Sequence, residues 1–408
     1  MSFDSSWILH YYDLNIIIWS EFLNIQMVIS AIFAAILIAL LTVHIAYPYV
    51  LKRLSNKYTD EFGIRRANLE PISDLPTVSI LIPVYNEESM IEYRINNILQ
   101  SNYPENKIEI IVIDSGSNDK TRLIVRSKFS GKVTLITEEK RRGKANAINL
   151  GLRSCNGQII ILTDGTAIYD KETLMHLVKP FRNNTIGAVS AFYDVPNSTE
   201  SHLSASESKF WTLKDSLRAL ESIVYSTSWL SGEACAFRNN VIQAVDEDSL
   251  ADDSNIALQF ISKGHKVVVN QNARFKERSP TEFSDYIKVK SRRALGGLVE
   301  TLRFKSLLFN ANYGYFGTII FPYRFFVCLI SPILACLLLV LAIPSIVELV
   351  SMTGYVTAVL TGIGLILIFL LFKELFLTFF YTQLITIIAL FWWAFGKRDV
   401  RWTRSKTR

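Results

Sequence analysis

A strand–helix–strand pattern in the first half of the chain constrains its fold most strongly. Two short apolar runs rich in branched residues, 78–83 and 108–113, end at a proline and before an aspartate. Between them, residues 87–99 place isoleucines and a leucine on one face at helical spacing. This succession predicts a βαβ unit in a parallel sheet. We therefore expect an α/β domain whose ligand lies beyond the carboxyl ends of the strands.

Further apolar runs extend the predicted sheet. We expect strands at 133–136, 159–163, 187–192 and 266–270, and helices at 144–152 and 171–181. Residues 281–308 alternate apolar and basic side chains, which favours an amphipathic helix at a membrane surface.

Apolar blocks flank this domain on both sides. Residues 27–51 are long enough to span a bilayer, and residues 316–395 are apolar with few breaks. We expect an interfacial helix at 7–25, a transmembrane helix at 27–49, and apolar segments at 325–347, 355–372 and 375–395. A signal peptide is the alternative for the first block, but that block lacks a basic leader and a small-residue cleavage site.

The charge pattern bears on orientation. The net charge is +6, and basic clusters lie beside the apolar blocks, at 52–66 and 397–408. Juxtamembrane Lys and Arg favour the cytoplasmic face, so we expect a multi-pass protein of the cell membrane with its central domain in the cytoplasm and no nucleic-acid partner. Two full C-terminal spans and one re-entrant or interfacial segment would keep the basic tail inside, whereas three full spans would place it outside.

These patterns predict five parts of the chain. An N-terminal interfacial segment and transmembrane helix occupy 1–55, and the cytosolic α/β domain, which begins with a polar linker, occupies 56–280. Amphipathic interfacial helices follow at 281–315, then a C-terminal transmembrane region at 316–396 and a basic tail at 397–408.

Polar side chains follow the first two strands, at the predicted ligand edge. Tyr85 and Glu87 come after the first strand, which ends at Pro83, and Asp114 comes after the second. A carboxylate at a strand end can accept hydrogen bonds from a uracil or a ribose. The alternative is structural: a polar turn capping the next helix, with Asp119 stabilising the turn after Asp114.

A basic loop and an acidic turn follow further along the chain. Arg141, Arg142 and Lys144 stand near a predicted helix N-terminus and form a natural anion site, with a solvated basic loop as the alternative. Asp164 follows an apolar run, and an oxygen ligand there suits Mg²⁺ or Mn²⁺. The four cysteines lack metal-ligand spacing, so we expect free thiols in a reducing compartment.

Two adjacent carboxylates, Asp252 and Asp253, precede a predicted helix at 256–263. Adjacent carboxylates raise one another's pKa, which suits one of them to act as a general base. Capping of the helix N-terminus is the alternative, and one aspartate could do that while the other carries out chemistry.

The order of these motifs resembles that of the family-2 glycosyltransferases, inverting enzymes with a GT-A fold. The motifs are PVYNE at 83–87, IDSGSNDKT at 113–121, RRGKANA at 141–147, DGT at 164–166 and ADDS at 251–254. The likeness is greatest to the membrane-embedded branch that contains cellulose, hyaluronan and poly-N-acetylglucosamine synthases. It covers about residues 77–300 and the flanking membrane helices.

The resemblance implies a role for each motif. The residues that it places at the nucleotide sugar are Pro83, Tyr85, Glu87, Asp114, Lys144, Asp164, Lys290 and Arg293. Asp164 would also bind Mg²⁺ or Mn²⁺ at the diphosphate, although Thr166 replaces the family's second acid. Asp253 would be the general base, with Asp252 beside it.

Two further stretches resemble the acceptor side of these enzymes. The residues that this likeness places at the acceptor are Trp229, Ser231 and Gly232. Lys290 and Arg293 stand in the Q-x-x-R-W motif of processive synthases, where Arg293 would neutralise the leaving diphosphate. Ala294 stands where that motif has the tryptophan that stacks on the acceptor.

The resemblance thus implies an inverting membrane hexosyltransferase. It would move a sugar from a nucleotide sugar, expected to be a UDP-sugar, to a lipid-linked or growing polysaccharide acceptor. A processive synthase that also extrudes its polymer is the alternative. A transporter or scaffold is a remote one, because such proteins should show paired membrane halves and this sequence does not. A catalytically inactive binding module should have lost Asp253, which is present.

Overall fold

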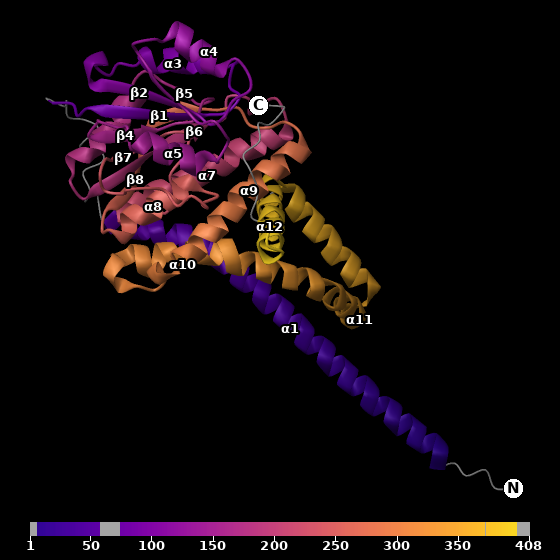
Figure 1. The fold of residues 1–408 in the computed structure, drawn as a ribbon. Helices are drawn as coiled ribbons and strands as arrows, with labels where there is room; N and C mark the ends of the chain where they lie inside the picture. The colour runs from indigo at the N-terminus through magenta and orange to yellow at the C-terminus, as the bar shows by residue number, and fades with distance from the viewer. Residues whose placement is uncertain (1–5, 58–73, 372, 398–408) are drawn as a thin grey trace. The chain divides into compact units, whose positions relative to one another are not determined.

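The described residues of the computed structural model, 6–57, 74–371 and 373–397, contain one eight-stranded mixed sheet (Figure 1). Its strands are β1 (Val78–Val84), β2 (Ile108–Asp114), β3 (Thr134–Thr137), β4 (Ile159–Leu162), β5 (Ile168–Tyr169), β6 (Ile186–Asp194), β7 (Cys235–Arg238) and β8 (Lys266–Lys276). Their order across the sheet is β3-β2-β1-β4-β7-β6-β8-β5.

The first half of the sheet is parallel, as the sequence predicts. Strand β1 pairs in parallel with β2 and with β4, and β2 pairs in parallel with β3. The sheet as a whole is mixed, because β7 runs antiparallel to both β4 and β6. Strands β5 and β7 were not predicted, since each is too short to give a periodic signal.

Helices cover both faces of the sheet (Figure 1). They are α3 (Ile91–Leu99), α4 (Thr121–Lys128), α5 (Lys144–Leu152), α6 (Thr173–Val178), α7 (His202–Val224), α8 (Asp252–Ser262) and α9 (Phe283–Arg303), with short turns η1 (Glu105–Lys107), η2 (Lys179–Arg182), η3 (Lys305–Leu307) and η4 (Ala311–Tyr313). Side chains from α3 and α4 join Ile80 and Ile82 in one apolar core. On the other face, Gly151 of α5 packs against Leu81 and Ile113.

Two predicted helix starts are wrong. Helix α3 begins at Ile91 rather than near residue 87, because Asn86 has a positive φ of 56° and the following residues form a turn. Helix α8 begins at Asp252, four residues before the predicted start. The predicted helix over 171–181 is divided into α6 and the 3₁₀ turn η2.

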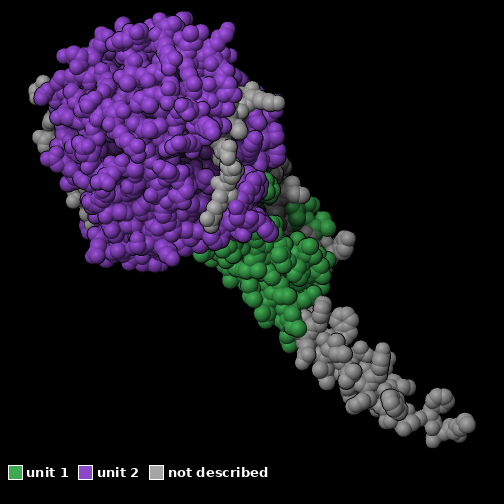
Figure 2. Space-filling model, in the orientation of Figure 1, with its two compact units in different colours: residues 1–47, 330–387 green, residues 48–329, 388–408 purple. Residues whose placement is uncertain are grey.

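Contacts divide the chain into two units (Figure 2). One comprises Met1–Tyr47 and Ile330–Ile387, and the other comprises Pro48–Leu329 and Ile388–Arg408. The second unit contains the sheet and every candidate site residue. In the first unit, Ser331 and Gln383 are hydrogen-bonded side chain to side chain, and Ser30 donates to Glu348. Polar side chains in apolar helices thereby satisfy one another.

The terminal helices differ from the prediction. Helix α1 (Ser6–Lys57) is continuous, so no break separates the predicted interfacial helix from the predicted span. The segments 325–347 and 355–372 are not separate either, since α11 (Ser331–Leu371) runs through the region between them. Within the described ranges, two helical stretches, Asn24–Lys57 and Phe316–Glu348, are long and apolar enough to cross a membrane.

The remaining helical segments complete the described chain. They are the π-helical turns η5 (Phe316–Ile320) and η6 (Phe326–Ile330), the short helix α10 (Phe321–Phe325) and helix α12 (Lys373–Ala394). Most of the predicted polar linker and all but the first residue of the predicted basic tail lie outside the described residues. The four cysteines are free, as expected.

Candidate active site

The ends of β1 and β2 form the first part of the site. In the parallel pair, Pro83 is opposite Ile113 and Val84 is opposite Asp114. The two turns that follow are tied together, because the Asn118 amide donates to Asn86 Oδ1 at 2.9 Å. The structure therefore brings the predicted residues Pro83, Tyr85 and Asp114 to one edge of the sheet.

Tyr85 and Glu87 lie on either side of that turn in very different surroundings. The Arg141 guanidinium lies 3.9 Å from the centroid of the Tyr85 ring, a cation–π contact that joins the basic loop to the tyrosine. Glu87 is only 1% exposed, and its amide donates to Thr121 Oγ1 at 2.9 Å. A Cβ on Gly165 would lie 3.3 Å from Glu87 Cγ, so this carboxylate sits directly beside the Asp164 turn.

The Asp114 carboxylate is fully buried, and only one of its two oxygens has hydrogen-bond partners among the described residues. Its Oδ2 accepts from the Ser117 amide at 3.2 Å and from Arg122 Nε. Its Oδ1 has no hydrogen-bond partner among the residues that the structure describes. A buried acceptor left without a donor costs about 1–3 kcal/mol, so Asp114 Oδ1 is a position where a ligand N–H or O–H would be bound. Asp119 accepts from the Thr121 amide at 2.9 Å and stabilises the turn, as expected.

Lys144 is the first residue of α5, and it joins two acidic motifs. Its Nζ lies 2.7 Å from Asp164 Oδ1 and 3.4 Å from Asp252 Oδ2. Burial opposes the charge of Lys144, but Asp164 and Asp252 raise its pKa above the ordinary value. Burial also raises the pKa of Asp164, and the nearby Glu233 and Asp252 raise it further, because one ammonium cannot offset several carboxylates.

The turn that carries Asp164 contacts a second acid, Glu277, which directly follows the distant strand β8. Thr166 Oγ1 donates to Glu277 Oε1 at 2.7 Å, and Glu277 is 3% exposed. The antiparallel pairing of β5 with β8 produces this contact, since Ile168 is opposite Lys276. The described residues contain no group of three or more His, Cys, Asp or Glu arranged to hold a metal. A site with few protein ligands, such as Asp164, still fits Mg²⁺ or Mn²⁺, because such ions take the rest from phosphates and water.

Asp252 and Asp253 are the first two residues of α8. The N-cap position is Ala251, and no side chain caps the helix there, so neither aspartate is the N-cap residue. Asp253 Oδ1 accepts from the Ser254 amide at 2.6 Å. Burial, together with Asp252 and Glu233, raises the pKa of Asp253 to about 6. A carboxylate with that pKa is largely deprotonated at pH 7 and still basic enough to accept a proton.

Gly232 lies beside both Lys144 and Asp253. A Cβ there would come within 3.4 Å of Lys144 Nζ and 3.5 Å of Asp253 Cβ. The absence of a side chain therefore keeps open the space between the cation and the candidate base, as the sequence predicts for a close approach.

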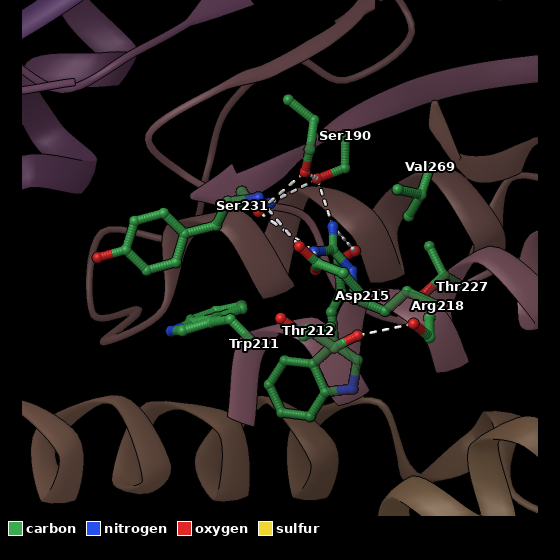
Figure 3. A network of polar contacts seen from close by, with 12 residues as sticks. Ser190, Trp211, Thr212, Asp215, Arg218, Thr227, Ser231 and Val269 are labelled. Carbon is green, nitrogen blue, oxygen red and sulfur yellow. Dashed lines mark hydrogen bonds and ion pairs between the residues drawn. The ribbon is translucent and has the colours of Figure 1, made fainter. Parts of the chain in front are cut away.

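A buried ion pair holds the loop that carries Gly232 (Figure 3). Arg218 Nη1 lies 2.6 Å from Asp215 Oδ1, and both side chains are almost fully buried. Arg218 also donates to Ser190 Oγ, to Ser231 Oγ at 3.3 Å and to the Trp229 carbonyl at 3.2 Å. The predicted acceptor residue Ser231 is 2% exposed and accepts from this guanidinium, so its hydroxyl fixes the loop.

The predicted acceptor residue Trp229 is half-buried and surrounded by cations. Lys214 Nζ lies 4.4 Å from its ring centroid, and the Arg324 guanidinium carbon lies 3.8 Å from it. A Cβ on Gly297 of α9 would come within 2.9 Å of the ring. Two cationic contacts and the close approach of α9 thus fix the orientation of this tryptophan.

Helix α9 aims Lys290 and Arg293 at carboxylates. Lys290 Nζ lies 2.6 Å from Glu207 Oε2, and Arg293 Nη2 lies 2.6 Å from Glu233 Oε1. Burial lowers the pKa of Lys290. Burial opposes the charge of Arg293 too, but Glu233 and Glu277 raise its pKa well above the ordinary value. The structure thus connects Arg293 with the acids near Asp164 and Asp253.

Sequence reasoning missed four residues of this neighbourhood: Glu207, Lys214, Glu233 and Glu277. Glu233 follows the predicted Gly232, so its position in the same loop is the only local signal. Glu277 gives none, because the pairing of β5 with β8 brings it to the site. Glu207 and Lys214 lie on the long helix α7, where charged residues ordinarily face solvent.

Comparison with known proteins adds the family. The model of the glycosyl transferase family 2 matches residues 79–245, a stretch that ends before Asp252 and Asp253. A probable glycosyltransferase, YdaM, of Bacillus subtilis (strain 168) is 25% identical over 62% of this chain and 64% of its own length. A poly-β-1,6-N-acetyl-D-glucosamine synthase of Staphylococcus aureus (strain COL) is 24% identical over 57% of each chain. These matches span less than two thirds of both curated relatives.

A solved structure has a similar fold over most of its length. It is the mannosyltransferase PcManGT from Pyrobaculum calidifontis in complex with GDP-Man and Mn²⁺, with a TM-score of 0.68 and 24% identity. The likeness covers 90% of this chain and 99% of that one. Together with the mixed sheet, it shows a GT-A-like α/β fold. The family match, the fold and the motif order agree, and residues 79–245 therefore form a domain of glycosyl transferase family 2.

Proposed function

We propose that this chain is an inverting membrane glycosyltransferase that moves a sugar from a UDP-sugar to a lipid-linked acceptor. The observation that carries the proposal is the convergence of Lys144, Asp164, Asp252 and Asp253 around Gly232. Lys144 contacts two acids from separate motifs, at 2.7 and 3.4 Å, and Gly232 leaves space beside Asp253. A cation, a candidate metal ligand and a candidate base thus surround one small volume.

Asp114 supports a uracil base over a guanine. One carboxylate oxygen of Asp114 already accepts from Ser117 and Arg122, whereas Oδ1 has no partner among the described residues. Uracil presents one N–H donor between its two carbonyl groups, which suits a single acceptor oxygen. Guanine presents two adjacent donors that would require both oxygens. The mannosyltransferase of similar fold was solved with GDP-Man, so a GDP-sugar is the donor against which a UDP-sugar is tested.

Asp164 and Glu277 are the residues that would hold Mg²⁺ or Mn²⁺ with the diphosphate. Thr166 replaces the second acid of the motif, and its hydroxyl holds the Glu277 carboxylate at 2.7 Å. The presence of Mn²⁺ in the structure of the mannosyltransferase also supports a divalent ion. The ion would supply positive charge to the diphosphate.

Asp253 acts as the general base in the proposed step. Its carboxylate accepts the proton of the acceptor hydroxyl while that oxygen forms a bond to C1 of the donor sugar. The bond from C1 to the diphosphate breaks, and its electron pair leaves with the diphosphate. Attack opposite the leaving group inverts the configuration at C1. Lys144 and Arg293 offset the negative charge that develops on the diphosphate.

A processive polysaccharide synthase is the second candidate. It is favoured by the similarity to the poly-β-1,6-N-acetyl-D-glucosamine synthase. Two features favour short products instead: Ala294 gives no ring for the acceptor, and the Trp229 ring already contacts Lys214 and Arg324. For either product, we propose a multi-pass protein with its catalytic domain in the cytoplasm, based on the basic residues beside the apolar blocks.

The test is an assay of the purified chain in lipid nanodiscs. A panel of UDP- and GDP-sugars is supplied with Mn²⁺ or Mg²⁺, and the released nucleoside diphosphate is measured. We expect release of UDP that increases when a lipid-linked acceptor is added. Release from GDP-sugars alone would overturn the donor assignment. No release from any donor, by protein that still binds Mn²⁺–UDP, would overturn the proposed activity.

A further inference from the structure

Helix α7 carries a lysine, Lys214, that forms no ion pair within the part of the chain that the structure describes. Lys214 forms no ion pair and no hydrogen bond with the side chains of the described residues; its contacts are aromatic. Its Nζ lies 4.6 Å from the ring centroid of Trp211 and 4.4 Å from that of Trp229. The side chain is half-buried, so water only partly solvates the ammonium.

Helix α9 brings a second ammonium to the same rings. Lys290 Nζ lies 4.5 Å from the ring centroid of Phe210 and 5.4 Å from that of Trp211. Its side chain is 11% exposed and pairs with Glu207. Lys214 and Lys290 therefore face the same aromatic pair, Phe210 and Trp211, and of the two lysines only Lys290 forms an ion pair within the described residues.

Other charges nearby also act on Lys214. Arg218 and Lys290 repel Lys214, whereas Asp253 and Asp215 attract it. Asp215 is already paired with Arg218 at 2.6 Å. Burial, with these two cations, lowers the pKa of Lys214 to about 7. A second cation at a half-buried position is destabilising by itself, and a bound anion would relieve it.

The location of these lysines connects them with the acceptor. Trp229 begins the loop that continues through Ser231 to Gly232, and Gly232 lies against Asp253. Lys214 is also close enough to Asp253 for their charges to interact. The donor-side residues Tyr85 and Asp114 follow different strands, β1 and β2. An anion at Lys214 and Lys290 would thus lie on the acceptor side of the candidate base.

We infer that Lys214 and Lys290 form an anion subsite that binds the phosphate of a lipid-linked acceptor, with Phe210, Trp211 and Trp229 as its walls. The phosphate accepts charge-assisted hydrogen bonds from the two ammonium groups, and the sugar next to it presents its hydroxyl to Asp253. This inference rests on the proposed function and deepens it. It selects a phosphate-bearing acceptor over a neutral polysaccharide.

The experiment uses the full chain in phosphatidylcholine nanodiscs, with decyl phosphate as the probe and decyl glucoside as the uncharged control of equal chain length. Binding is measured by calorimetry and by the fluorescence of the tryptophans. We expect decyl phosphate to bind at least about tenfold more tightly than decyl glucoside, because two charge-assisted contacts are gained. The Lys214→Met variant should lose most of that preference. Lys209→Met, at an exposed position of the same helix, should keep it.

Two further measurements distinguish the sources of the phosphate and the role of the charge. Inorganic phosphate should compete only weakly, because it lacks the lipid tail; equal affinity for it would overturn the acceptor assignment. Lys214→Arg should bind decyl phosphate like the wild type at pH 6 and more tightly at pH 8.5. The reason is that Lys214 loses its proton as the pH rises through about 7, whereas an arginine stays charged.

The failure of this inference can be told apart from a failure of the proposed function. Binding of Mn²⁺–UDP is measured on every variant, and we expect Lys214→Met to leave it unchanged because Lys214 is not among the residues placed at the nucleotide sugar. Unchanged nucleotide binding together with equal binding of decyl phosphate to the wild type and to Lys214→Met would overturn the subsite alone. If the wild type itself did not bind Mn²⁺–UDP, that result would overturn the proposed function instead.

Discussion

The donor side and the acceptor side of this site are built in different ways. On the donor side, Tyr85, Asp114 and Asp164 follow the adjacent parallel strands β1, β2 and β4. On the acceptor side, Trp229 and Lys290 depend on α7 and α9, and on the ion pair of Lys290 with Glu207, two residues far apart in sequence. The first side follows from the order of the strands, and the second from helix packing.

The two sides also leave opposite groups available. The donor side presents a buried acceptor oxygen, Asp114 Oδ1, without a partner among the described residues. The acceptor side presents an ammonium, Lys214, whose contacts there are aromatic rings. We therefore expect the donor side to select an N–H group and the acceptor side to select an anion. The predictions below test this division, from the largest expected effect to the smallest.

Substitution of Asp253 should have the largest effect, because it should lower turnover while leaving donor binding nearly unchanged. Asp253→Asn removes the base and should lower turnover by about 10²–10⁴, a typical contribution of general base catalysis. Binding of Mn²⁺–UDP should be nearly unchanged, because the donor residues remain. Turnover is measured by UDP release, and Asp248→Asn, at an exposed position shortly before α8, is the matched control. Comparable turnover in folded Asp253→Asn would show that another group is the base.

Glu277 tests whether a distant strand completes the donor side. Glu277→Gln should weaken the binding of Mn²⁺ in the presence of UDP by about 10–100-fold, the usual cost of altering a group that supports a metal. In that background, Thr166→Asp should restore much of the affinity by supplying the missing acid. Calorimetry with and without UDP measures both effects. Full affinity in Glu277→Gln would leave Asp164 as the only protein carboxylate on the ion.

Product length tests the acceptor side. An aromatic platform is worth about 1 kcal/mol beyond its buried area, or roughly tenfold in the residence of the acceptor. Since Ala294 offers no such platform, we expect products of one or a few sugars that remain extractable with lipid. Sizing of radiolabelled product from a short assay with excess donor is the measurement. A polymer of high molecular weight, formed while most acceptor is unused, would favour the processive candidate.

The pH dependence tests the acidic pair at the boundary between the two sides. The pKa of Asp253 is raised to about 6, so kcat/KM should fall as the pH drops below 6 and the base becomes protonated. Asp252→Asn removes a like charge and should move this acidic limb to lower pH, by about one unit or less. An unchanged limb in Asp252→Asn would show that burial and Glu233, rather than Asp252, raise the pKa of Asp253.

Much of the donor side could be predicted from local sequence patterns. The apolar runs at 78–83, 108–113 and 159–163 form β1, β2 and β4, and the helix predicted at 144–152 is α5. Residues directly after such strands reach the same edge because consecutive parallel strands align their carboxyl ends. The meeting of Tyr85, Asp114 and Asp164 near that edge therefore required only the strand boundaries.

Tertiary structure decided the groups that complete the site. Glu277 reaches Thr166 through the pairing of β5 with β8, and β5 is only two residues long. Lys214 and Lys290 meet because α7 packs near α9, and neither helix has a local pattern that marks these charges as partners. Periodicity reports which face of an element is buried, whereas a contact between distant charges depends on how elements pack. For that reason the sequence by itself determined the strand-end motifs, and only the folded chain determined which distant charges accompany them.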